Sequence, residues 1–240
     1  MLWLLLVSTL GWPAREAHAG DRSPDMTRRR ESISESGITL VLHRSQQARL
    51  DSLPSAERGT PNAVVVQLSL QRLLRTLEIH QQVELRIISG DTVAETVHGG
   101  VVVANEALAV LPEGERLFIL AHELGHVVLG HWSQMGDLYQ QYIPGKVTQA
   151  KTDAVSDALG RAASAMARRQ EFAADAFALR TLREMGFADA HAVSALSRFG
   201  FHRDSATHPG TRQRLAALCA IDAARSDPAQ VETAGLDATP

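Results

Sequence analysis

The chain has 240 residues, of which 45% are hydrophobic, enough for one domain with a substantial core. Its formal net charge is -3, from 24 basic and 27 acidic residues, so it lacks the basic excess that indicates a nucleic-acid partner. The one cysteine, Cys219, excludes a disulfide framework and a cysteine-based metal cluster within the chain. Its surroundings, "RLAALCAI", predict that it is a small buried apolar residue.

The first 19 residues have the pattern of a secretory signal peptide. An apolar region from Leu2 to Trp12 is shorter than the roughly 20 residues of a membrane span, and Ala17-His18-Ala19 offers a small-x-small cleavage site. No Lys or Arg precedes the apolar region, so a short buried strand or a misassigned start codon remains an alternative. Cleavage near Ala19 predicts a periplasmic or secreted protein. No later segment is apolar for long enough to cross a bilayer.

Residues 20–60 form a polar lead-in that is expected to be partly disordered. Residues 20–36 are charged and contain several serines, which predicts disorder. Residues 37–60 are ambiguous, because "GITLVLH" fits a strand whereas "RSQQARLDSL" fits one or two helical turns that end before Pro54.

The folded domain is predicted to span residues 61–225. Leucines at helical spacing predict a first helix after Pro61, and β-branched segments bounded by glycines predict three short strands, at residues 83–89, 92–97 and 100–105. The following helix begins near Pro112 and ends near Trp132.

The second half of this domain is predicted to be helical. After a mixed segment with a break at Pro144-Gly145, helices are expected at 151–168, 169–185, 188–199 and 210–225, followed by a disordered tail at 226–240. The predicted fold class is therefore α+β, mainly helical, with a small β-sheet next to the helix that ends near Trp132.

The stretch "FILAHELGHVVLGHW", residues 118–132, carries the first functional signal. On a helix, His122 and His126 lie one turn apart on the same face, so both imidazoles can bind one metal ion, and Glu123 can hold a water beside it. The alternative is a buried helix with satisfied histidines, but burying these three groups without a common partner is costly. His131 follows His122 by nine residues, which points it away from the ion, so a packing or hydrogen-bonding role is expected. Gly125 suggests a close approach, such as a substrate strand.

A third ligand must come from elsewhere in the chain. A histidine ten residues after His122 would complete one class of zinc site, but that position is Trp132. Of the later glutamates, Glu184 lies at a helix end and Glu232 in the tail, which leaves Glu171. Glu171 and Asp175 share a helix face, so Glu171 can ligate and Asp175 can accept the second N–H of a ligand histidine. Spacing alone equally allows an acidic edge paired with the neighbouring arginines.

Three motifs in order carry a family resemblance: "AHELGHVVLGH", "RRQEFAADAFALRTLREMGF" and "ATHPGTRQRL". Together with "HGGVVVANEALAVLPEGERLFILAHE" upstream, they resemble the HtpX/Ste-type zinc metallopeptidases, peptidase family M48, and its soluble periplasmic-type members in particular. The residues that match the family pattern are His122, Glu123, His126, His131, Glu171, Asp175, His208-Pro209 and Arg214. The chain departs from that pattern at Val93 and at His98, where the family usually has asparagine and proline.

The resemblance implies a gluzincin-type domain that holds one Zn²⁺ per chain on His122, His126 and Glu171, with Asp175 behind a ligand and Glu123 as catalytic base. It implies a metalloendopeptidase that acts on polypeptides, with unfolded or misassembled cell-envelope proteins as expected substrates. Two alternatives remain, a zinc-containing chaperone-like or regulatory protein with little proteolysis and a zinc hydrolase of non-peptide substrates.

Further expectations concern the substrate. Strand 100–104 is expected to pair with an extended substrate. His208, in the loop "DSATHPG", is expected to lie over the metal site, either as a catalytic or gating residue or as a tie that holds the loop. The remaining candidates for a second oxyanion donor are Arg214, Tyr139 and Tyr142.

Overall fold

The computed structural model describes residues 37–198, 203–205 and 207–226. The expected signal peptide, residues 20–36 of the lead-in and almost all of the expected tail lie outside these residues. The described helices are α1 (Ile38–Ser52), α2 (Pro61–Thr76), α3 (Glu113–Val128), α4 (His131–Tyr142), α5 (Gln149–Glu184), α6 (Ala190–Arg198) and α7 (Thr211–Ser226). The strands are β1 (Glu84–Ile88), β2 (Ala94–Val97) and β3 (Val101–Asn105), and a 3-10 helix, η2, spans Glu106–Val110. The expected fold class, α+β and mainly helical, is confirmed.

Three elements differ from the sequence-based expectation. Residues 38–52 form one helix rather than a strand and a short turn. Residues 149–184 form one helix of 36 residues rather than two. The helix that carries the histidine motif ends at Val128, because Gly130 adopts a left-handed conformation with φ of 65° and starts α4 in a new direction.

The sheet has the strand order β1-β3-β2, with β1 parallel and β2 antiparallel to β3. The central strand, β3, is therefore paired on both edges, and the expectation that residues 100–104 receive a substrate strand is wrong. The edge strand on the other side, β2, has no further strand paired to it among the described residues.

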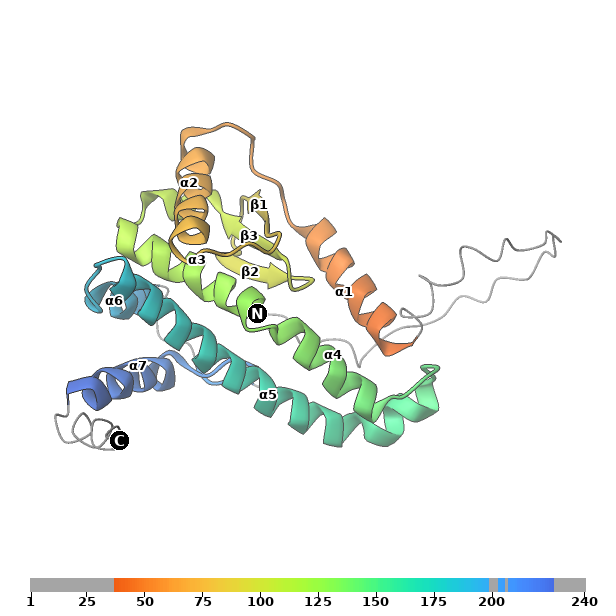
Figure 1. Ribbon diagram of the computed structural model, residues 1–240. Coiled ribbons are helices and arrows are strands. Elements are labelled where there is room, and N and C mark those ends of the chain that lie inside the picture. The colour runs from red at the N-terminus through yellow and green to blue at the C-terminus, as the bar shows by residue number, and fades with distance from the viewer. Residues whose placement is uncertain (1–36, 199–202, 206, 227–240) are drawn as a thin grey trace, which may run out of the picture.

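Helix α3 lies between the sheet and α5, as Figure 1 shows. Its interior face packs with Val102 and Ala104 of β3 in the main core cluster. Helix α1 packs against the opposite face of the sheet through Leu50, together with Leu53, which follows the helix. The sheet on one side and α5 on the other therefore hold α3 in place.

Gly125, near the C-terminal end of α3, serves this packing. A Cβ atom on Gly125 would lie 3.1 Å from Cδ1 of Phe177 and 3.3 Å from Cα of Ala174, both on α5. The close approach expected at Gly125 is therefore made by α5 and not by a substrate strand.

Two further observations concern the exterior. Cys219 is exposed rather than buried, because it lies on the outer face of α7. Among the described helices, none combines the length and the apolar character needed to cross a membrane.

Candidate active site

Helices α3 and α5 bring three potential metal ligands together. Nε2 of His126 lies 3.3 Å from Nε2 of His122. The carboxylate of Glu171 on α5 lies across from both rings, with Oε2 at 3.6 Å from His122 Nε2 and Oε1 at 3.5 Å from His126 Nε2. Bonds of 2.0–2.1 Å to a tetrahedral ion imply about 3.3–3.4 Å between ligand atoms. The three donor atoms therefore have the spacing that one such ion requires.

The burial of Glu171 separates the two interpretations left open by its spacing. Glu171 is 7% exposed, so it is no solvated acidic edge. Its neighbour Arg168 instead donates to Gln213 and to the backbone oxygen of Ser205. A buried carboxylate that faces two imidazoles has the character of a metal ligand.

On the side of α5 and α7, His122 is held by charged groups. Oδ1 of Asp175 lies 2.9 Å from His122 Nδ1, so His122 donates this N–H and keeps Nε2 free for a metal. Arg214 of α7 donates to both Asp175 oxygens, at 2.7 and 2.5 Å. Burial by itself raises the pKa of Asp175, but Arg214 and His122 overcome this effect and hold the pKa at about 2.

On the other side, His126 is held by a neutral group. Its Nδ1 lies 2.9 Å from Nδ1 of His131, the first residue of α4, and the backbone oxygen of His131 accepts a bond from Gln170. Burial lowers the pKa of His131 to about 4, so its ring is neutral at neutral pH and its Nδ1 can accept the Nδ1–H of His126. The expected hydrogen-bonding role of His131 fits this contact. The expected direction, away from the site, is wrong because the chain turns at Gly130.

Glu123 points from α3 toward β2. Its carboxylate Oε2 lies 2.9 Å from the hydroxyl of Thr96, which also lies 2.8 Å from the backbone oxygen of Glu123. Burial raises the pKa of Glu123 to about 6, and Thr96 and His122 only partly oppose this effect. A carboxylate with such a pKa can both accept and return a proton near neutral pH.

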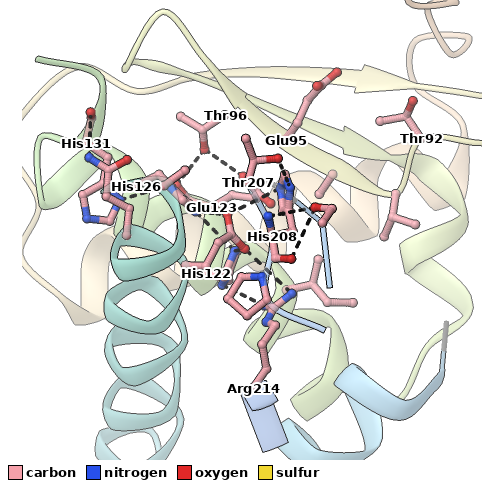
Figure 2. A pocket seen from close by; sticks show the side chains of 18 of the residues that line it. Thr92, Glu95, Thr96, His122, Glu123, His126, His131, Thr207, His208 and Arg214 are labelled. Carbon is pink, nitrogen blue, oxygen red and sulfur yellow. Dashed lines mark hydrogen bonds and ion pairs between the residues drawn. The ribbon is translucent and has the colours of Figure 1, made fainter. Parts of the chain in front are cut away.

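The loop before α7 brings His208 to the same place. His208 Nε2 lies 3.6 Å from Oε1 of Glu171, and Thr207 Oγ1 lies 2.9 Å from His208 Nδ1. In Figure 2 the ring of His208 points into the same space as Glu123 and His122. Thr207 therefore fixes Nδ1 of His208, while Nε2 faces the carboxylate of Glu171. Burial lowers the pKa of His208, so its ring is neutral at neutral pH.

A cavity of about 1040 Å³ surrounds these residues and is walled by β2 on one side and by α3, α5 and the His208 loop on the others. Of the oxyanion candidates, Arg214 and His208 line it. Tyr139 and Tyr142 do not, because they pack with Ile143 and Leu159 in a separate cluster between α4 and α5.

The fold and the site together define a class: a mainly helical metallopeptidase domain whose motif helix and a second helix supply two histidines and one glutamate. The family model that matches the chain is that of peptidase family M48, over residues 65–222. The protein therefore belongs to peptidase family M48, a family of zinc-dependent metallopeptidases. A search of curated proteins found no significant match.

The contacts of His126 with His131 and of Thr96 with Glu123 were not predicted from sequence. The contact between His126 and His131 could have been found from Gly130. This glycine follows an apolar helix at the position where a left-handed residue often ends a helix. The contact between Thr96 and Glu123 has no such signal, because it depends on which strand lies at the sheet edge.

Proposed function

We propose that the protein is a zinc-dependent endopeptidase that hydrolyses peptide bonds in unfolded or misassembled proteins of the cell envelope. The observation that carries the proposal is the convergence of His122, His126 and Glu171 at the spacing of a tetrahedral site, with the Glu123 carboxylate beside them. The membership of family M48 supports the same chemistry.

The three ligand atoms would hold Zn²⁺, which when bound supplies a Lewis acid for the scissile carbonyl and acidifies the attacking water. Glu123 takes the proton of that water and returns it to the leaving amine. His122 and His126 keep their Nε2 atoms aimed at the ion because Asp175 and His131 accept at the other ring nitrogens.

Substrate binding is assigned to the outer edge of β2. This edge is unpaired among the described residues, and residues 93–96 line the cavity in front of Glu123. An extended peptide added there would place a backbone carbonyl near the ligand group. Only unfolded or flexible chains offer such a peptide, which supports the substrate class proposed.

The test combines metal analysis with cleavage of casein. Purified protein is expected to contain one zinc per chain and to cleave casein until a chelator removes the metal, with activity returning when zinc is added. Bound zinc without any cleavage would favour a chaperone-like protein, and activity on small esters alone would favour a hydrolase of non-peptide substrates.

His208 is assigned a gating role in this proposal. Its Nε2 already faces Glu171 Oε1, so it can occupy the open ligand position or contact the substrate carbonyl. For a gate, His208→Ala changes turnover, upward if the residue blocks the site, with thermal stability little altered. If His208 only ties the loop to the site, stability and activity fall together.

The proposal also includes export to the periplasm or the exterior. It rests on the apolar region and the Ala17-His18-Ala19 site within the first 19 residues. Mass spectrometry of the protein from a periplasmic extract is expected to give a new N-terminus at Gly20. An intact Met1 on cytoplasmic protein would contradict export.

A further inference from the structure

We propose that Thr96 is a positioning residue for the base Glu123 and that it couples this base to the strand that receives the substrate. The inference rests on the proposed function, because it assigns a partner to the base of that reaction. The contact joins β2 to α3, two elements 27 positions apart in sequence at these residues.

The hydroxyl of Thr96 makes two contacts with Glu123. Its Oγ1 lies 2.9 Å from Glu123 Oε2 and 2.8 Å from the backbone oxygen of the same residue. One hydroxyl therefore touches both the carboxylate and the helix turn that carries it. A shift of β2 relative to α3 would change both distances together.

The carboxylate has few other restraints. In the described part of the chain, Thr96 is the one side chain that hydrogen-bonds to Glu123. The terminal torsion of glutamate has a broad, roughly two-fold preference, so it is fixed by partners rather than by its own rotamers. The nearby carboxylates of Glu95 and Glu171 repel it. The hydroxyl of Thr96 therefore decides where the carboxylate oxygens lie.

A hydroxyl suits this position during a reaction cycle. It carries one proton and two lone pairs, so it can donate to the ionised carboxylate. After the carboxyl has taken a proton from water, the hydroxyl can accept from it and donate to the backbone oxygen instead. Valine has the same shape and can do neither.

Because Thr96 lies on β2, its backbone belongs to the edge assigned to the substrate. A peptide that pairs with this edge is thereby held at a fixed distance from the base. A misplacement of a reacting atom by about 1 Å can lower a rate by about 100-fold. Loss of the contact between Thr96 and Glu123 should therefore lower the rate of cleavage measurably.

The test compares Thr96→Val, which removes the hydroxyl at nearly constant volume, with Thr96→Ser, which keeps it. The control is Thr181→Val, because the hydroxyl of Thr181 also donates to a backbone oxygen, that of Phe177 within α5, and Thr181 lies outside the site. We expect Thr96→Val to lower kcat by about 10–100-fold, the range typical of lost outer-shell partners. KM and zinc content are expected to stay as in the wild type. Thr96→Ser is expected to remain within about threefold, and Thr181→Val to match the wild type.

A second measurement needs neither metal nor activity. In metal-free protein labelled with ¹³C at glutamate carboxyls, the signal of Glu123 is assigned by its absence from Glu123→Gln. We expect this signal to be single in the wild type, Thr96→Ser and Thr181→Val, and to broaden or divide in Thr96→Val as the carboxylate samples more than one orientation.

Three results would overturn the inference. They are a wild-type kcat in Thr96→Val, a loss in Thr96→Ser as large as in Thr96→Val, or a loss of zinc in Thr96→Val. A wild-type protein without chelator-sensitive cleavage would instead overturn the proposed function itself, and the carboxyl signal would then still show whether Thr96 orients Glu123.

Discussion

The two sides of the metal site differ in the charge of the groups that surround it. On the α5–α7 side, Asp175 is bonded to Arg214 and His122, and its pKa is held at about 2. On the β2–α4 side the partners are neutral, the hydroxyl of Thr96 and the imidazole of His131.

Burial does not explain this difference, because Asp175 is 1% exposed and Glu123 is 9% exposed. What separates them is the partner. A guanidinium keeps Asp175 ionised, whereas no cation of the described residues is bonded to Glu123, whose pKa rises to about 6. The charged side is suited to holding a cation permanently, and the neutral side is suited to moving a proton.

The largest expected effect comes from removing the proton acceptor on the neutral side. Glu123→Gln should lower kcat by about 10²–10⁴-fold, the usual contribution of general acid–base catalysis, and should keep full zinc content because the ligands are untouched. Casein cleavage and metal analysis on the same sample check both parts. Loss of zinc, or cleavage at the wild-type rate, would contradict the assignment of Glu123 as base.

The next effect comes from the ligand on the charged side. Glu171→Ala removes one of three donor atoms, so zinc affinity should fall by more than the 10–100-fold expected for an outer partner. Competition with a chelator of known affinity measures it. Glu184→Ala, another glutamate of α5, is the control and should bind zinc as the wild type does. Equal occupancy in Glu171→Ala and the wild type would exclude Glu171 as a ligand.

A smaller effect is expected from the partner of a ligand. Asp175→Ala leaves His122 without its acceptor and Arg214 without its carboxylate, so zinc affinity should fall by about 10–100-fold. Asp175→Asn keeps the shape and an acceptor oxygen, and should fall less. A larger loss in Asp175→Ala than in Glu171→Ala would mean that the outer partner, and not the glutamate, holds the ion.

The neutral side also predicts a pH effect on stability in metal-free protein. The raised pKa of Glu123 means that folding favours its protonated form, so the wild type loses stability as pH rises from about 4.5 to about 6. A shift from 4.5 to about 6 corresponds to about 2 kcal/mol. Glu123→Gln lacks this loss.

The free energy of unfolding in urea should therefore be higher for Glu123→Gln than for the wild type, by a margin that grows between pH 4 and pH 7. A margin that is equal at both pH values would contradict the raised pKa.

The two proposed histidine ligands were predictable from local spacing, whereas Glu171 also needed the order of the motifs. His122 and His126 share a helix face at a separation of four, and Glu171 and Asp175 do so on the next long helix, so each pair needs only that its helix forms. The order of the three motifs then indicated that the two helices meet.

The neutral side was predicted poorly because it depends on how separate segments meet. Whether β2 or β3 lies at the sheet edge is decided by pairing, and both are short β-branched segments, so Thr96 carried no signal. The turn at Gly130 changes the direction of His131 by ending the helix, whereas angular reasoning assumed that the helix continued. One residue in a left-handed conformation was enough to move His131 from the far face to the site.

The smallest expected effect tests His131 itself. His131→Ala removes the acceptor for His126 Nδ1, as Asp175→Ala does for His122, but the lost acceptor is uncharged. Hydrogen bonds between neutral groups are roughly half as strong as charge-assisted ones. We therefore expect zinc affinity to fall by about tenfold or less, at or below the lower end of the range for outer partners.

His131→Gln is the conservative variant, because its amide oxygen can accept the same N–H, and it should recover part of the loss. His80→Ala, an exposed histidine outside the site, is the control and should change nothing. The double variant with Asp175→Ala sharpens the test: the two partners act on different ligands of one ion, so their losses should add if each only orients its own ring. A loss in His131→Ala equal to that in Asp175→Ala would show that charge does not distinguish the two sides of the site.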